Sequence, residues 1–202
     1  MAAERRSRAA TEVKRIQLLD AAEEVILENG YAAVSSRSVA SRVGMQPPHL
    51  HYYFATIDDL FVAVLRRRSS QNVDRMTQAL DSPEPLRSWW KLASDQRGTA
   101  LFVELLAAAN HRPALKAEIA AMAKDVRALQ IERLATLLGD YGLDPEVFTP
   151  VLVAAAVQGL AFAVVTDQAA GYDTHPDEAA AAMDRLVTDL EARKRSRGVP
   201  RN

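Results

Sequence analysis

The segment from Ser35 to Phe54 constrains the fold of this chain most, because two short helical patterns meet there at a glycine. In the first pattern, Val39, Ala40 and Val43 fall on one side of a helix, and the serine pair before them supplies an N-cap hydroxyl. Gly44 follows, where a left-handed backbone costs little because there is no Cβ. The spacing therefore predicts a short helix that ends in a tight turn.

The second pattern begins at Gln46, and the two prolines after it suit a first helical turn, whose amides have no partner inside the helix. Leu50 and Phe54 are four residues apart and are expected to face inward. The polar and aromatic side chains between them are left for the outer face. Two helices joined in this way predict a helix-turn-helix, whose outer side chains suit phosphates and base edges of DNA. A small helical hairpin without a DNA role is the alternative.

The flanking sequence extends the pattern. Asn29-Gly30-Tyr31 closes a long amphipathic helix before it, and Thr56-Ile57-Asp58-Asp59-Leu60 opens another after it. The run from about Ile16 to Leu65 resembles the N-terminal domain of the TetR family of transcriptional regulators. The matching pieces are Asn29-Gly30-Tyr31, Ser35-Ser36, Val39-Ala40, Val43-Gly44-Met45, Leu50, Tyr53-Phe54 and Asp59-Leu60. The resemblance implies an all-α fold, in which a three-helix head with a helix-turn-helix joins a helical-bundle body that binds a ligand and dimerises.

The sequence departs from the family pattern at three places. Pro47-Pro48 stands where one flexible polar and one small residue are usual, and His51 where a phosphate-binding tyrosine is common. Ile57 stands where the family usually has a lysine, which removes a positive charge near the phosphates. That lysine contact is therefore not carried over to this chain.

The resemblance also implies which side chains meet DNA. Side chains expected at base edges are Gln46, Pro48, His49 and Tyr52, with Pro47 on the same surface. Those expected at phosphates are Ser36, Arg37, His51, Tyr53 and Thr56. A disordered basic arm carrying Arg5, Arg6 and Arg8 is expected to reach the minor groove or the phosphates, and a solvated terminus is the alternative.

Composition favours a helical bundle. Of 202 residues, 49% are apolar and 6% aromatic, and the absence of cysteine excludes disulfides and thiolate sites. The formal net charge is −1, yet residues 69–192 hold ten basic and eighteen acidic residues, whereas residues 1–68 hold ten and eight. The start is charged and resembles no signal peptide, and the apolar run from Val151 to Val165 falls short of the ~20 residues of a membrane span. These features predict a soluble cytoplasmic protein.

Everything after the helix-turn-helix is expected to be helical. The sequence predicts a DNA-binding domain over residues 1–55 and a ligand-binding and dimerisation domain over residues 56–202. The first helix is expected from about Arg8 to Asn29, with Ile16, Leu19, Ala22 and Ile26 on its buried stripe. A helix of about 25 residues is expected from Thr56, and later helices at about 84–95, 97–110, 113–138, 149–169 and 176–194, because prolines mark their starts.

Two features of the body bear on function. Aromatic, methionine and polar side chains are expected to line a mostly apolar pocket, with core packing as the alternative: Trp89, Trp90, Phe102, Asn110, Met122, Arg127, Gln158 and Phe162. Resemblance to the family implies that the last two helices form a four-helix interface between subunits, with burial within one chain as the alternative. The interface residues are expected to be Ala154, Val157, Ala161, Val165, Met183 and Leu186.

No pattern of catalysis emerges. The four histidines, His49, His51, His111 and His175, do not fall at metal-ligand spacing, and no Ser-His-Asp or paired-carboxylate motif is present. We therefore expect no catalytic residue, metal or cofactor. The sequence predicts a homodimeric, ligand-responsive transcriptional regulator, specifically a repressor released from a palindromic operator by a largely apolar small molecule. A helical protein-interaction module without sequence-specific DNA binding is the rival.

Overall fold

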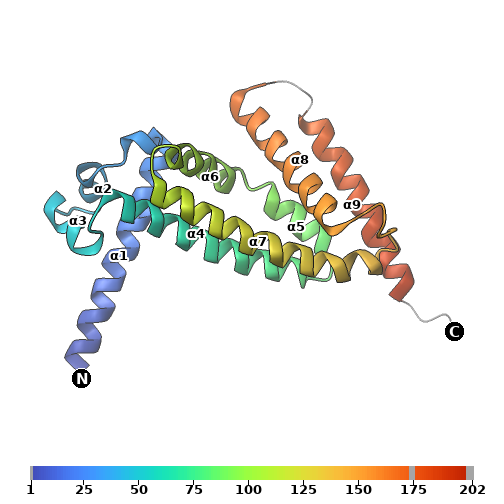
Figure 1. Ribbon diagram of the computed structural model, residues 1–202, viewed down its shortest axis with the longest axis horizontal. Helices are drawn as coiled ribbons and strands as arrows, with labels where there is room; N and C mark the ends of the chain where they lie inside the picture. The colour runs from blue at the N-terminus through green and yellow to red at the C-terminus, as the bar shows by residue number, and fades with distance from the viewer. Residues whose placement is uncertain (1, 173–175, 199–202) are drawn as a thin grey trace. The chain divides into compact units, whose positions relative to one another are not determined.

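The computed structural model describes residues 2–172 and 176–198, and within these ranges every regular element is helical (Figure 1). The expected all-α fold is confirmed, and His175 lies outside the described residues. The helices are α1 (Ala2–Asn29), the 3₁₀ turn η1 (Tyr31–Ala33), α2 (Ser36–Arg42), α3 (Pro47–Tyr53), α4 (Ile57–Leu80), α5 (Pro85–Ala93), α6 (Gln96–Ala109), α7 (Pro113–Asp140), α8 (Pro150–Ala170) and α9 (Pro176–Gly198).

The chain packs as two compact units. The first comprises Met1–Ser70 with Ala100–Ala121, and the second comprises Gln71–Thr99 with Met122–Asn202. Helices α4 and α7 each run without interruption from one unit into the other. The packing units thus differ from the functional division at residue 55 that the sequence suggests, because α6 and the first turns of α7 pack with the head.

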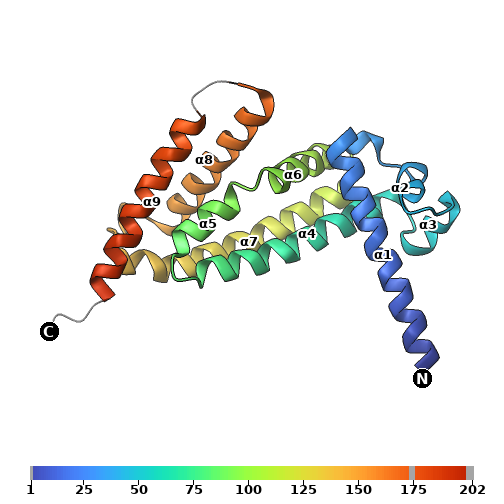
Figure 2. The same ribbon diagram turned by 180° about the vertical axis from the view of Figure 1, so that it is seen from behind.

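Helix α1 is longer than expected. It begins at Ala2 rather than near Arg8, so the expected disordered arm is helical in this structure. Residues 2–29 contain neither glycine nor proline and are rich in alanine, glutamate and arginine, which favour helix. The N-terminal half of α1 projects away from α2 and α3 in both views (Figures 1 and 2). Ile16 is 43% exposed instead of buried, and the buried stripe of α1 begins at Leu18.

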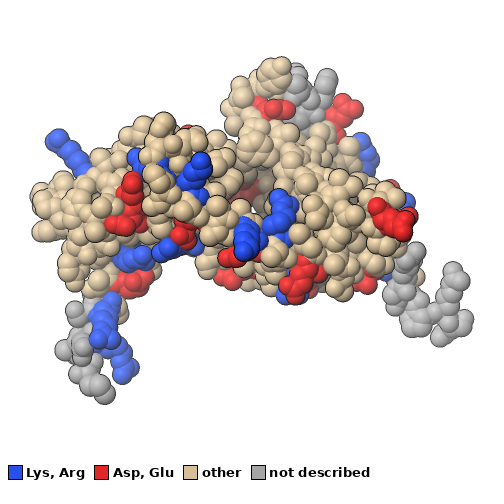
Figure 3. Space-filling view, in the orientation of Figure 1, with Lys and Arg blue, Asp and Glu red and all other residues tan. Residues whose placement is uncertain are grey.

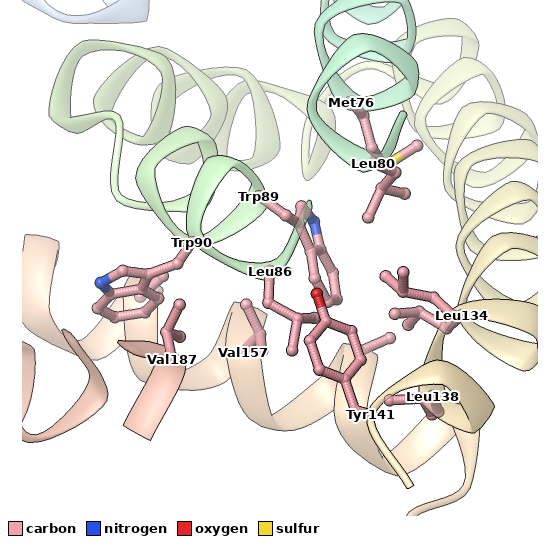
Figure 4. Packing of buried hydrophobic residues seen from close by; sticks show 13 residues of the cluster. Met76, Leu80, Leu86, Trp89, Trp90, Leu134, Leu138, Tyr141, Val157 and Val187 are labelled. Carbon is pink, nitrogen blue, oxygen red and sulfur yellow. The ribbon is translucent and has the colours of Figure 1, made fainter. Parts of the chain in front are cut away.

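The second unit has its own hydrophobic core. Trp89 and Trp90 of α5 pack there with side chains of α4, α7, α8 and α9 (Figure 4). Trp90 lies against Val187, and its indole Nε1 donates a hydrogen bond to Asp184 at 3.1 Å. The other core residues are Met76, Leu80, Leu86, Leu134, Leu137, Leu138, Tyr141, Ala154, Val157 and Ala161.

A buried carboxylate joins three helices of this unit. Glu191 of α9 is 1% exposed and accepts hydrogen bonds from the backbone N–H of Leu86 at 2.9 Å and of Arg87 at 3.3 Å. Its other oxygen accepts from the Tyr141 hydroxyl at 2.9 Å. Burial, with the hydrogen bond to Glu191 adding to it, raises the pKa of Tyr141 above its ordinary value. Glu191 thus serves as an N-terminal cap for α5 from about a hundred residues away along the chain.

Helix α8 is apolar on nearly every side. Its 21 residues are long and apolar enough to cross a membrane by length and composition, contrary to the expectation from the shorter run between Val151 and Val165. Only 28% of its most apolar stretch is buried inside the chain. Both views show α8 beside α9, so one face of α8 is packed within the unit and the opposite face is left uncovered (Figures 1 and 2).

Candidate nucleic-acid interface

The helix-turn-helix is fixed by local sequence. Ser35 is the N-cap of α2 and forms a capping box with Ser38: its Oγ accepts from the Ser38 N–H at 3.1 Å, and Ser38 Oγ accepts from the Ser35 N–H at 2.9 Å. Gly44 ends the first helix with φ +65°, a conformation in which a side chain would be strained. Ala40 and Leu50, one from each helix, are 0% exposed. The pair therefore packs as a rigid unit with one face outward.

Two contacts with α1 hold this unit against the rest of the head. The Arg15 guanidinium of α1 lies 5.3 Å from the ring centroid of Phe54, which follows α3 and is 4% exposed. Arg42 of α2 pairs with Glu28 of α1, and this hydrogen bond raises the pKa of the Arg42 guanidinium. Both expected inward residues, Leu50 and Phe54, are buried. The orientation of the outer face is thereby set against α1.

The outer face carries the side chains expected at base edges. Tyr52 is 77% exposed, and its ring meets that of Tyr53 edge-on with centroids 5.1 Å apart. Gln46, Pro48 and His49 are also exposed. Pro47 and Tyr53 are half-buried. Because α3 is seven residues long and begins with two prolines, the ring of Tyr52 is presented on a stiff support.

His51 is held by two hydrogen bonds rather than left free. Its Nδ1 lies 3.1 Å from the carbonyl oxygen of Ala55, and its Nε2 lies 3.1 Å from Oγ of Ser36. A carbonyl can only accept, so Nδ1 carries the proton in the neutral ring. Nε2 is then the acceptor, and the Ser36 hydroxyl donates to it.

The remaining residues expected at phosphates lie on α1 and α2 and at the start of α4. Arg37 is exposed on α2. Thr56 caps α4, since its Oγ1 accepts from the Asp59 N–H at 3.0 Å while its own N–H donates to the Asp59 carboxylate at 2.9 Å. Arg5 and Arg8 are exposed on α1, and Figure 3 shows blue side chains along the N-terminal part of that helix. Arg6 lies in α1, but its side chain is outside the described residues.

The structure does not gather the expected ligand residues into one cluster. Trp89 and Trp90 are 2% and 5% exposed in the core of the second unit, which matches the alternative of core packing. Phe102 of α6 and Phe162 of α8 are instead 37% and 46% exposed. Asn110 is exposed in the turn after α6, whereas Met122, Arg127 and Gln158 are half-buried in the second unit.

The expected dimer residues fall on two different faces. Ala154, Val157, Ala161 and Val165 are 0–6% exposed on the inner face of α8, where they pack against their own chain. Met183 is half-buried and packs against the core of the second unit. Leu186 of α9 is 52% exposed. For the four α8 residues the structure matches the alternative of burial within one chain, and a helix that is apolar on nearly every side gives no periodicity from which to predict its inner face.

Contacts that local sequence did not reveal join α6 to the head within the first unit. The Glu104 carboxylate of α6 accepts a hydrogen bond from the backbone N–H of Tyr31 at 2.8 Å, where α1 ends and η1 begins. Arg112, just after α6, pairs with Asp58 of α4 at 3.0 Å. Its guanidinium also lies 4.5 Å from the ring centroid of Phe61. No sequence motif marks these long-range partners.

The head of this chain is similar in sequence to known proteins. Residues 18–64 match the family of bacterial regulatory proteins, tetR family. The HTH-type transcriptional activator FasR of Mycolicibacterium smegmatis is 39% identical over 67 residues, which are 33% of this chain and 31% of FasR. The fatty acid metabolism regulator protein of Bacillus subtilis is 31% identical over 65 residues, 32% of this chain and 34% of that protein. The matched segment thus spans about a third of these curated relatives.

Similarity beyond the head comes from solved structures. The multidrug binding protein EbrR, whose crystal structure contains imidazole, is 27% identical and superposes with a TM-score of 0.57 over 86% of this chain and 94% of EbrR. A helix-turn-helix head on an all-α body defines a class of DNA-binding proteins. Within that class, the chain belongs to the TetR family of transcriptional regulators.

Proposed function

We propose that this chain is a cytoplasmic transcriptional regulator that reads duplex DNA with the outer face of α2 and α3. The observation that carries the proposal is the 77% exposure of Tyr52 on a helix whose opposite side, at Leu50, is fully buried. A large ring held in water by a rigid support suits contact with thymine methyls or a phosphate. Residues 1–55 supply this contact in the proposal, and residues 56–202 bind the effector and the second subunit.

Neighbouring side chains take separate roles. Gln46, Pro48 and His49 join Tyr52 toward base edges. Arg37 and Tyr53 position the head on phosphates, together with Ser36 and His51. Thr56 already caps α4 through Asp59, so any contribution from Thr56 to phosphate binding comes on top of that cap. Arg5, Arg6 and Arg8 add positive charge along helical α1.

Replacing Tyr52 with alanine tests the proposal. On a duplex selected from a random library by the wild-type protein, we expect Tyr52→Ala to lose about 1–3 kcal/mol of binding and to relax selectivity at one base position. Tyr172→Ala is the matched control, because Tyr172 is 64% exposed outside the head. Fluorescence anisotropy across a salt series, with the selected duplex and its single-base variants, measures the affinity and the selectivity. Equal losses in the two variants would contradict the assignment.

The same salt series distinguishes a DNA-binding regulator from the rival function, a helical protein-interaction module. A protein that neutralises phosphates binds duplexes more weakly as salt increases. A helical protein-interaction module would bind no duplex at any salt concentration. Among the described residues, no group of histidine and carboxylate side chains could hold a metal ion, and relatives with this head are transcriptional regulators.

We propose that a second copy of the chain covers the outer face of α8. Leu152 and Phe162 are 52% and 46% exposed on this face. Gly159 lies between them along the helix, and a Cβ at this position would have no neighbouring atom within 4 Å, so the surface there is open to a partner helix. The exposed Leu186 of α9 adds to the same kind of surface. A symmetric pairing presents two heads, so the operator is a near-palindrome with half-sites about 34 Å apart or a multiple of that distance.

Two side chains of α7 support a ligand site in the second unit. The buried stripe of α7 is apolar at Leu134, Leu137 and Leu138, but one turn earlier it carries Gln130, which is 1% exposed, and then Arg127. Gln130 Oε1 and Arg127 Nη1 are buried without a hydrogen-bond partner. Leaving such groups unpaired costs stability. We propose that a largely apolar effector satisfies them with one polar end.

A route from the body to the head follows α4, α6 and α7. Because α4 and α7 belong to both units, a displacement in the second unit continues along each helix into the first. There, Glu104 holds Tyr31 and Arg112 holds Asp58, so α6 and the turn between α6 and α7 contact both ends of the segment that carries α2 and α3. In the proposal, the chain is a repressor, and the effector favours the state that does not bind DNA. A shift from 1:99 to 99:1 requires about 5.5 kcal/mol of differential affinity.

Arg127→Met and Gln130→Met test the effector site. We expect each variant to be at least as stable as wild type without ligand, because an unpaired buried polar group is removed. An effector found by screening should bind each variant about tenfold more weakly. Tryptophan fluorescence from Trp89 and Trp90 follows the titration, and Lys124→Met, at an exposed position of α7, is the control.

The linkage between effector binding and operator binding provides a second test of the effector site. Operator duplex must weaken effector binding by the same factor by which effector weakens operator binding. Unchanged effector affinity in the Arg127 and Gln130 variants, or equal affinity with and without operator, would contradict the site or the switch respectively.

A further inference from the structure

We propose that DNA binding by this chain takes up a proton at His51, which releases the Ser36 hydroxyl to donate to a backbone phosphate. The inference rests on the proposed DNA-binding function and concerns one contact within it. It comes from the two hydrogen bonds of the imidazole, 3.1 Å from Nε2 to Ser36 Oγ and 3.1 Å from Nδ1 to the Ala55 carbonyl.

The neutral ring leaves Ser36 unsuited to a phosphate. A serine hydroxyl has one proton. Nδ1 donates to the Ala55 carbonyl, so Nε2 has a lone pair and takes that single proton from Ser36 in a hydrogen bond. The outward side of Oγ then carries only lone pairs, which repel phosphate oxygens. A phosphate at Ser36 must either break the hydrogen bond to His51 or accept no hydrogen bond from the hydroxyl.

Protonation reverses the direction of this hydrogen bond. When Nε2 gains a proton, both ring nitrogens are donors, so Nε2 donates to Oγ and the Ala55 carbonyl still accepts from Nδ1. Ser36 keeps its own proton and can now direct it to a phosphate oxygen. The imidazolium adds a positive charge one hydrogen bond behind that contact. The DNA-bound state therefore favours the protonated ring, and His51 acts as a positioning residue for Ser36.

The charged groups on the helices beside His51 are arginines and carboxylates. Histidine is the side chain that changes its charge between about pH 5 and 8. On α2, Arg37 keeps its charge throughout this range, and Arg42 is paired with Glu28. In the first turn of α4, Asp58 is paired with Arg112, and Asp59 holds Thr56.

His49, Tyr52 and Tyr53 are the other titratable groups on α3. Tyrosine keeps its proton over this pH range. His49 is a second exposed imidazole on the same helix, so its contribution has to be separated by mutation.

The direction in which DNA affinity changes with pH follows from linkage. If DNA binds the protonated form more tightly, affinity rises as pH falls, with at most one proton taken up per head. Coupling of this kind typically changes affinity by about 5–150-fold. We expect at least a fivefold gain in affinity for the selected duplex between pH 8 and pH 6 at constant ionic strength.

Three variants of the full chain test the relay. Anisotropy titrations from pH 6 to 8 are made for wild type, His51→Gln, Ser36→Ala and His49→Gln, after circular dichroism has verified folding. Calorimetric titrations in two buffers of different ionisation enthalpy count the protons taken up. We expect the pH slope and the proton uptake to disappear in His51→Gln, to fall well below the wild-type values in Ser36→Ala, and to persist in His49→Gln. Ser36→Ala matters most, because it keeps the imidazole and removes only the hydroxyl.

Each other result overturns the proposal. A full slope in Ser36→Ala would show that the charge of His51 acts without Ser36, and loss of the slope in His49→Gln would assign it to the wrong histidine. Duplex binding with no pH slope would refute the relay and leave DNA binding intact. Absence of duplex binding at every pH would refute the DNA-binding function and the relay together.

Discussion

Phe162→Glu is expected to convert a dimer into a monomer and to abolish specific DNA binding. Phe162 is 46% exposed at the middle of the outer face of α8. A glutamate there would place two like charges in an apolar interface around a two-fold axis, and burying unpaired charges is far costlier than exposing them. In the proposed dimer each head contacts only one half-site, so loss of the partner would remove the second contact. Sedimentation should change from twice the chain mass to 22.1 kDa.

Matched variants locate the effect on that face. Phe102→Glu introduces the same charge at a phenylalanine that is 37% exposed on α6, and it should leave the dimer intact. Ala161→Glu should unfold the chain instead, because Ala161 is 1% exposed on the inner face of α8. A wild-type monomer at micromolar concentration, or a Phe162→Glu dimer, would refute the proposed interface.

The sequence predicted the head well because its signals are local. Ser35 caps α2, Gly44 adopts the left-handed turn, and Pro47 starts α3. Each of these residues acts within a few positions of itself, so a single sequence reveals it. Prolines and glycines also predicted the helix boundaries in the body, where α7 begins at Pro113 and α9 at Pro176, as expected.

The inner face of α8 was not predictable from its sequence. The helix is apolar on nearly all sides, so no 3.6-residue period separates the buried from the exposed face. The structure resolves the choice by packing Ala154, Val157 and Ala161 against the core of the second unit. The α8 residues that family resemblance suggested for the interface therefore lie on the inner side of this helix, and the outer side is where we propose that a second copy binds.

Long-range polar contacts were missed for a different reason. Glu104 and Tyr31 are 73 residues apart, and Glu191 and Leu86 are 105 apart. In each pair, a carboxylate meets a backbone N–H, and a backbone amide carries no sequence information. The buried Gln130, whose Oε1 has no hydrogen-bond partner, shows the same limit, since nothing in the sequence distinguishes it from a solvated glutamine.

Removing the carboxylate of Glu191 is expected to destabilise the fold strongly. Glu191→Ala would leave the N–H groups of Leu86 and Arg87 and the hydroxyl of Tyr141 buried without an acceptor. Each lost partner costs roughly 1–3 kcal/mol, and with partial relaxation we expect a total of about 3–5 kcal/mol. For a chain of this length, that corresponds to a drop in Tm on the order of 10 °C.

A graded series distinguishes capping from packing. Glu191→Gln keeps one carbonyl oxygen for the N–H of Leu86 and can still bond Tyr141 through its amide, so it should lose less than half as much as Glu191→Ala. Asp189→Ala removes an exposed carboxylate two residues earlier on α9 and should stay within about 0.5 kcal/mol of wild type. Urea unfolding at one fixed protein concentration, followed by tryptophan fluorescence, measures all three, because the proposed dimerisation would make stability depend on concentration. Equal losses in the alanine and glutamine variants would show that side-chain volume, rather than the hydrogen bonds to α5 and Tyr141, makes Glu191 indispensable.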